Sequence, residues 1–472
     1  MASTSDPRTL GPSRGDRTRF GFETTLLVIA VLLVNLITIG AVTRYGPVML
    51  LAPVLVLALT FAALRLLDDP VDVLCWFLVI IVNLDFLRIQ GTRLTADILT
   101  SSMLLYAVLV RIGLAGTMAV RGGVQKVFLV YLCLTFISVV LSVNPPASFK
   151  NWGRDLEYWV LFIFLSTLAI SETQRIRIAV ASAVSSVIPC LLGLAGMVFG
   201  IDAFYGAETP VEGGPWVKRV TGTLSHPVVF SEYLAFMSTI TLSLIILQKR
   251  WRALLVPVFL LQLVILYLTY GRTGWIGMLV AIIALFWLMG KKKVVFTVLP
   301  MMGAGLLAMV PTMLARMQNA FDLSKESDNS IIWRLGLWAY ALKKFPQKPI
   351  FGSGQDTFIN YVAYGTQRIN LRHRAGTGFA AHHTWIGLLI ETGLVGMLMF
   401  LVLMVTVGKS LKRRRMEPDG RRDPIVIGVS AAFAGLIVSS FAGDPFNIPV
   451  ISVYFWVLLS LALKPRPATV AA

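Results

Sequence analysis

The sequence has few charged residues for its length, and few cysteines or histidines. Only 14% of its 472 residues are Asp, Glu, Lys or Arg, whereas 56% are hydrophobic. A soluble globular protein carries about 25% charged residues. This composition argues against a soluble α/β enzyme and indicates a chain that is surrounded by lipid.

Several kinds of chemical site are missing from the sequence. The three cysteines, Cys75, Cys133 and Cys190, lie far apart in apolar runs, without CxxC spacing. They therefore exclude a disulfide framework and a thiolate metal site, and are typical of small buried hydrophobes. The chain also lacks HExxH, DxD and Walker motifs, and we see no carboxylate cluster on the predicted outer side. We expect no metal, no cofactor and no nucleotide hydrolysis.

Apolar runs long enough to cross a bilayer recur along the whole chain. A transmembrane helix needs about 20 apolar residues, and the runs predict an all-α integral membrane protein with about 14 transmembrane helices. The predicted spans are 24–42, 47–64, 70–84, 96–114, 124–143, 156–171, 178–199, 227–247, 253–270, 273–290, 294–312, 384–408, 425–442 and 448–463.

The basic residues predict how these spans are oriented. Most of the 42 Lys and Arg residues fall in segments on the same side as the N-terminus, which favours a cytoplasmic location for that side. We therefore expect cytoplasmic tails at 1–23 and 464–472, transmembrane helices at 24–312 and 384–463, and a periplasmic catalytic loop at 313–383. The protein would lie in the bacterial inner membrane. Its net charge of +18 then reflects attraction to anionic lipid and not to nucleic acid.

The long outer loop is expected to contain short helices. Ser330 can cap a helix over 331–345, which Pro346 would end. The aromatic residues of this segment suit a helix that lies at the lipid headgroups.

Arginines gather on the predicted outer side, against the usual trend. The arginine fork binds phosphate oxygens bidentately, so Arg272, Arg334 and Arg219 are candidate ligands for a diphosphate. Arg368, Arg372 and Arg374 are weaker candidates of the same kind. The alternative is that these side chains reach toward headgroup phosphates as simple membrane anchors.

Two histidines stand where the chain re-enters the membrane after the long loop. An imidazole can accept a proton at neutral pH, so His382 is the candidate general base, with His383 and His226 as possible second sites. A histidine at a span end is otherwise an interfacial packing residue. Glu391 lies nine residues after His382 in the same span and is interpreted as a polar lock within the bundle.

Five motifs together resemble the superfamily of O-antigen ligases and O-antigen polymerases. The family's pattern of His-Asn, an apolar run and Glu-x-Gly-x-x-Gly is similar to residues 382–396, and the resemblance extends over roughly 145–400. The supporting motifs are Tyr270-Gly271-Arg272-Thr273-Gly274-Trp275, Thr221-Gly222-Thr223-Leu224-Ser225-His226-Pro227, Trp333-Arg334 and Pro349-Ile350-Phe351-Gly352-Ser353-Gly354. His383 and His226 depart from the family pattern, which has Asn at both positions.

The resemblance implies a metal-independent, inverting glycosyltransferase. Its donor would be a glycan on a polyprenyl diphosphate and its acceptor a glycan or lipid hydroxyl, with His382 as base and Arg272 and Arg334 on the diphosphate. Ligase and polymerase remain open, as does the choice between His382 and His383. The alternative function is a transporter or flippase of lipid-linked oligosaccharide, although the spans show no internal two-fold similarity.

Overall fold

The computed structural model is a bundle of helices, many of which begin and end close to the residues that the sequence predicts. It describes residues 70–84, 120, 122–201, 204, 209–210, 216–217, 219–224, 226–291, 293–294, 330–358, 361–362, 381–415 and 422–464. The longer helices are α3 (Pro70–Leu84), α5 (Gly123–Val140), α6 (Pro145–Thr167), α7 (Glu172–Val184), α8 (Val187–Phe199), α10 (Pro227–Leu247), α11 (Arg252–Leu268), α12 (Arg272–Leu288), α15 (Ser330–Lys344), α17 (Thr384–Arg415), α18 (Pro424–Ser439) and α19 (Pro449–Leu463). Two 3₁₀ turns, η2 (Lys249–Trp251) and η3 (Phe345–Gln347), precede α11 and follow α15. Strands β1 (Thr209–Pro210) and β2 (Trp216–Val217) form a short antiparallel pair.

Several of these helices have the length and composition of membrane spans. In the described part of the chain, five helical segments qualify, namely Gly123–Val140, Glu172–Phe199, Pro227–Leu247, Lys249–Leu268 and Thr384–Arg415. Shorter apolar helices, among them α12, α18 and α19, pack beside them. The protein is therefore a helical, multi-pass membrane protein. The predicted spans 24–42, 47–64, 96–114 and 294–312 lie outside the described residues, apart from residue 294.

One predicted loop is wrong. Residues 145–155 were expected to form a short outer loop, but they are the first turns of α6. Asn144 caps this helix by accepting a hydrogen bond from the backbone N–H of Ala147, and Pro145 and Pro146 occupy its first positions. Proline is favoured there because its missing N–H would have no partner inside the helix. The hydropathy of 145–155 is low, which hid the helix from a search for apolar runs.

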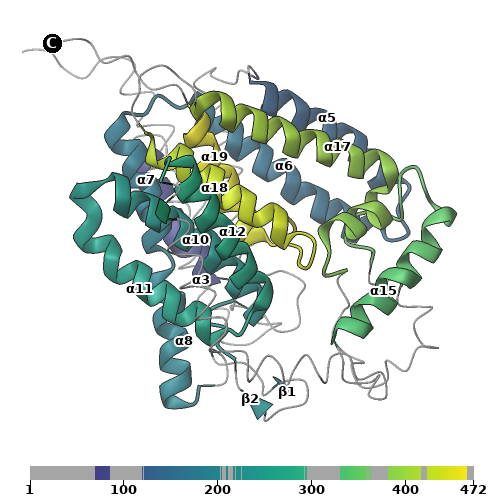
Figure 1. The fold of residues 1–472 in the computed structure, drawn as a ribbon. Helices are drawn as coiled ribbons and strands as arrows, with labels where there is room; N and C mark the ends of the chain where they lie inside the picture. The colour runs from purple at the N-terminus through teal and green to yellow at the C-terminus, as the bar shows by residue number, and fades with distance from the viewer. Residues whose placement is uncertain are drawn as a thin grey trace, which may run out of the picture.

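Helices α10, α12 and α18 form the tightly packed centre of the bundle (Figure 1). Small residues let them approach closely. A Cβ on Gly435 of α18 would lie 2.5 Å from the carbonyl oxygen of Gly277 on α12, and one on Gly277 would overlap Ser439. Ser243 of α10 donates a hydrogen bond of 2.7 Å to the carbonyl oxygen of Pro424 at the start of α18.

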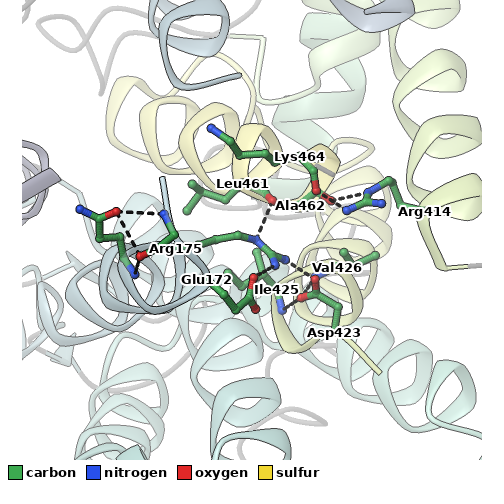
Figure 2. A network of polar contacts seen from close by, with 11 residues as sticks. Glu172, Arg175, Arg414, Asp423, Ile425, Val426, Leu461, Ala462 and Lys464 are labelled. Atoms are coloured by element: carbon green, nitrogen blue, oxygen red, sulfur yellow. Dashed lines mark hydrogen bonds and ion pairs between the residues drawn. The ribbon is translucent and has the colours of Figure 1, made fainter. Parts of the chain in front are cut away.

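The end of the bundle that carries the start of α7 is fastened by buried charges (Figure 2). Arg175 of α7, only 3% exposed, forms ion pairs with Glu172 and Asp423 and donates to the Leu461 carbonyl at 3.0 Å. Asp423 in turn caps α18 by accepting from the N–H groups of Ile425 and Val426. A buried charge is stable only when it is paired and hydrogen-bonded in this way.

The same end is also held by two further basic residues. Arg414 of α17 donates to the carbonyl groups of Ala462 and Lys464, as Figure 2 shows, and the Lys464 ammonium donates to the Leu165 carbonyl at 3.1 Å. Helices α6, α7, α17, α18 and α19 are therefore joined at one end by residues that are predicted to face the cytoplasm.

Helix α17 is broken at Gly393. The loop of residues 349–354 forms hydrogen bonds with the backbone groups of α17 on both sides of the break. Gly393 has φ 67° and ψ −169°, a conformation that essentially only glycine adopts. Backbone N–H groups of Leu394 and Val395 donate to the carbonyls of Pro349 and Ile350 at 2.9 and 3.2 Å.

The carbonyl groups on the other side of the break are bonded by the same loop. The N–H groups of Ser353 and Gly354 donate to the carbonyls of Ile390 and Glu391 at 3.0 and 2.8 Å. A Cβ on Gly352 would overlap the Glu391 carbonyl. Since unpaired backbone groups within a membrane cost several kcal/mol, the glycines of the loop and of α17 are required for this pairing.

Replacing Gly393 tests this pairing. Gly393→Ala should lower the free energy of unfolding by about 1–3 kcal/mol or more, because alanine is strained at this φ and its Cβ would overlap Ile350. The matched control is Gly408→Ala in the same helix, where a Cβ would make an ordinary 3.7 Å contact with Phe433. Thermal unfolding in detergent should show a large loss for the first variant and none for the second; equal melting temperatures would contradict the account.

Candidate functional site

The turn between α18 and α19 anchors the start of α17. Thr384 donates its backbone N–H to the carbonyls of Ser440 and Gly443 at 3.0 and 3.1 Å, and its hydroxyl to Asp444 Oδ1 at 2.9 Å. The Trp385 indole donates to Ser440 Oγ at 2.9 Å. We call residues 440–444 the anchor turn.

Helix α15 is attached to the same turn. Arg334 donates from Nη1 to the Ala442 carbonyl at 3.1 Å. One turn further along α15, the Trp338 indole donates to the Ala381 carbonyl at 2.8 Å, and its ring meets the His383 ring edge-on with 4.9 Å between the centroids. The predicted loop helix thus begins and ends within one residue of the sequence prediction and brings Arg334 to the anchor turn.

His382 lies between two fixed residues. Ala381 is held by Trp338 and Thr384 by the anchor turn, and His382 itself has φ 48°. A non-glycine residue in this left-handed region costs about 1 kcal/mol or more, and such strain concentrates at functional sites. The side chain is half-buried.

His383 has a different environment. Its Nδ1 accepts a hydrogen bond from the backbone N–H of Ile386 at 3.3 Å, and its ring packs between Trp338 and Phe441. Burial lowers the pKa of His383 below its ordinary value. His383 therefore caps α17 and packs at its start. This is the structural role that a histidine at the end of a span usually has.

Arg219 lies beside the turn that carries Arg272. Its Nε donates to the Thr269 carbonyl at 2.8 Å, three residues before Arg272. Arg272 is the first residue of α12, where the positive end of the helix dipole favours anions. Glycine is required on both sides of Arg272 for a steric reason. A Cβ on Gly271 or Gly274 would overlap Ser231 near the start of α10.

His226 caps α10 and lies within electrostatic range of two of the arginines. Its Nδ1 accepts from the backbone N–H of Val228 at 3.2 Å and so caps that helix. Partial desolvation, followed by the positive charges of Arg219 and Arg334, lowers the pKa of His226 to about 4. The predicted residues Arg219, Arg334 and His226 therefore lie within electrostatic range of one another, and the imidazole is neutral at pH 7.

The end of α18 contacts the start of α12, and the anchor turn that follows it contacts a carboxyl group. Ser439, the last residue of α18, donates to the Thr273 carbonyl at 3.3 Å. Glu232 of α10 is buried against Gly443, where an added Cβ would overlap its carboxylate, and is in electrostatic range of Arg334.

These observations place the predicted diphosphate ligands and the two histidines of the re-entry point around one end of α10, α12, α15 and α17. Residues 257–401 match a protein-family model described as O-antigen ligase.

The predicted resemblance is confirmed over this segment.

The matched segment contains Arg272, Arg334, His382, His383 and Glu391, whereas Arg219 and His226 precede it. A curated relative is the exopolysaccharide production protein ExoQ of Rhizobium meliloti (strain 1021), which is 26% identical over 155 residues. That similarity covers 30% of this chain and 34% of the relative, so the chain spans about a third of the length of ExoQ. Both matches connect the chain with membrane-bound polysaccharide biosynthesis.

A cavity beside the His382 segment contains polar residues that no sequence motif marked. Its lining includes four carboxyl groups, those of Asp155, Asp356, Glu391 and Asp444. Asp155 and Asp356 escaped notice because they lie some 200 residues apart in the sequence and belong to no motif.

The cavity carboxylates are structurally anchored. Glu391 accepts a 2.9 Å hydrogen bond from the Phe358 N–H, in agreement with its predicted role as a polar lock. Asp444 accepts from Thr384 and Asn447, and burial raises its pKa to about 6. Among the described residues, no three His, Cys, Asp or Glu side chains are grouped closely enough to hold a metal ion.

The lowered pKa of His226 predicts acid-sensitive folding. Imidazole takes up its proton near pH 6.5 in an unfolded chain, but in the native state only near pH 4. The native state thus binds fewer protons between these values, and its stability falls as the pH falls through this range. His226→Asn keeps a good helix cap and removes the titration.

We therefore expect the melting temperature of the wild type to fall more than that of His226→Asn on acidification from about pH 7 to about pH 4.5. Thermal unfolding in detergent at several pH values measures this. Parallel curves for the two proteins would contradict the electrostatic coupling among His226, Arg219 and Arg334.

Proposed function

We propose that the protein transfers a glycan from a polyprenyl-diphosphate carrier to an acceptor hydroxyl at the outer face of the bacterial inner membrane. The observation that carries this proposal is the convergence of Arg219, Arg272 and Arg334 beside the re-entry segment of His382. Three guanidinium groups suit a diphosphate, because each can donate two parallel hydrogen bonds to its oxygens.

The proposed reaction is a single inverting displacement. His382 accepts the proton of the acceptor hydroxyl while its oxygen forms a bond to the anomeric carbon. The bond between that carbon and the phosphate oxygen breaks, and the diphosphate leaves with the electron pair. The arginines stabilise the charge that develops on the diphosphate, and the carrier lipid stays in the bilayer.

The orientation in the membrane is part of the proposal. The opposite end of the bundle is rich in basic residues and includes Arg175, Arg414 and Lys464. Because such ends usually face the cytoplasm, both termini would be cytoplasmic and the site periplasmic. The printed name of ExoQ supports a polysaccharide product, without deciding between ligation to lipid and polymerisation of repeat units.

The role of His382 is tested with purified protein and a synthetic lipid-linked donor. His382→Ala should reduce transfer by about 10²–10⁴-fold, the usual contribution of a general base, while the protein still inserts into the membrane. The matched control is His383→Asn, which retains a cap acceptor for Ile386 and should stay active. Full activity of His382→Ala would end the proposal, and donor flipping without transfer would support a transporter.

The role of Arg272 is tested by a substitution that conserves charge. Arg272→Lys should lower transfer by about tenfold or more, because a point charge cannot replace the bidentate fork. Arg252→Lys is the matched control, since Arg252 also begins an apolar helix, α11, but at the opposite end of the bundle. If both variants kept wild-type rates, Arg272 would be a headgroup anchor and not a donor ligand.

A further inference from the structure

A cavity open on one side lies beside the segment that carries His382. It encloses ≈ 870 Å³, a volume that includes open solvent at its mouth. Its walls come from α5, α6, α17 and α19 and from the 355–358 segment, with residues such as Tyr131, Asp155, Leu388 and Trp456.

One wall of the cavity contains a polar atom without a partner. Gln355 is 3% exposed and lines the cavity; its Nε2 donates to Asp155 Oδ2 at 3.1 Å, but its buried Oε1 has no hydrogen-bond partner in the structure. A buried amide oxygen without a partner costs about 1–3 kcal/mol. This oxygen is therefore suited to accept a hydrogen bond from a ligand hydroxyl.

The remaining lining combines acceptors with aromatic faces. The carboxyl groups of Asp155, Asp356 and Asp444 are hydrogen-bond acceptors, and the rings of Phe128 and Trp456 stack with 4.4 Å between centroids. A pyranose ring presents hydroxyl donors around its edge and apolar C–H groups on its faces. Acceptors beside aromatic surfaces complement both of these features.

The cavity and Arg334 both adjoin the segment that carries His382. Ala381 and Thr384 line the cavity, while Arg334 donates to the anchor turn at Ala442. Thr384 also holds Asp444, another lining residue. A hydroxyl group bound at the cavity mouth would therefore lie close to the segment that carries His382.

We infer that this cavity binds the acceptor glycan through its hydroxyl groups. The inference rests on the proposed function, in which the arginines hold the donor diphosphate. It assigns Gln355 and Asp155 to acceptor recognition.

The test measures acceptor binding without catalysis. The probe is the repeat-unit oligosaccharide released from the cell's own surface polysaccharide by mild acid, and saturation-transfer NMR on the full-length protein in lipid nanodiscs reports its binding. The wild type and His382→Ala should bind it equally. Gln355→Met and Asp155→Asn should weaken binding by about tenfold, as expected for lost hydrogen bonds to charged or buried groups.

Two further variants make the result decisive. Asp356→Asn suits the left-handed backbone of that residue, φ 55°, and so tests the cavity mouth even if Gln355→Met fails to fold; it should also weaken binding. Glu172→Gln, at the opposite end of the bundle, should bind like the wild type. The inference is overturned if the oligosaccharide fails to bind the wild type or binds all the cavity variants equally well, whereas active His382→Ala protein would overturn the proposed function alone.

Discussion

The pairing of the 349–354 loop with the broken helix α17 is the constraint on which the His382 end of the molecule depends. Four backbone hydrogen bonds replace those that the break at Gly393 removes. The same pairing brings Gln355 and Phe358 against α17, so that Glu391 can accept the Phe358 N–H. A continuous helix would leave the loop unattached and would separate the cavity walls that α6 and α17 contribute.

The anchor turn holds α15 and α17 together at this end of the bundle. It fixes the start of α17 through Thr384 and Trp385 and receives Arg334 from α15. Arg334 and the cavity residues Thr384 and Asp444 are therefore attached to the same turn.

The sequence predicted the helices well wherever hydropathy decides the structure. The predicted spans 70–84 and 227–247 coincide with α3 and α10. The start of α6 was missed because its polar residues look like a loop. Gln355 and Asp155 were missed because their proximity depends on the pairing at Gly393, which no local pattern reveals.

The central claim is that the His382 end of the bundle faces outward while the Arg414 end faces the cytoplasm. The direct measurement is cysteine labelling of intact spheroplasts with a membrane-impermeant maleimide, after the three native cysteines have been replaced. Asn447→Cys, an exposed position beside the cavity, should be labelled at once, whereas Lys412→Cys near the end of α17 should be labelled only after lysis. Labelling of Lys412→Cys alone in intact spheroplasts would contradict the account.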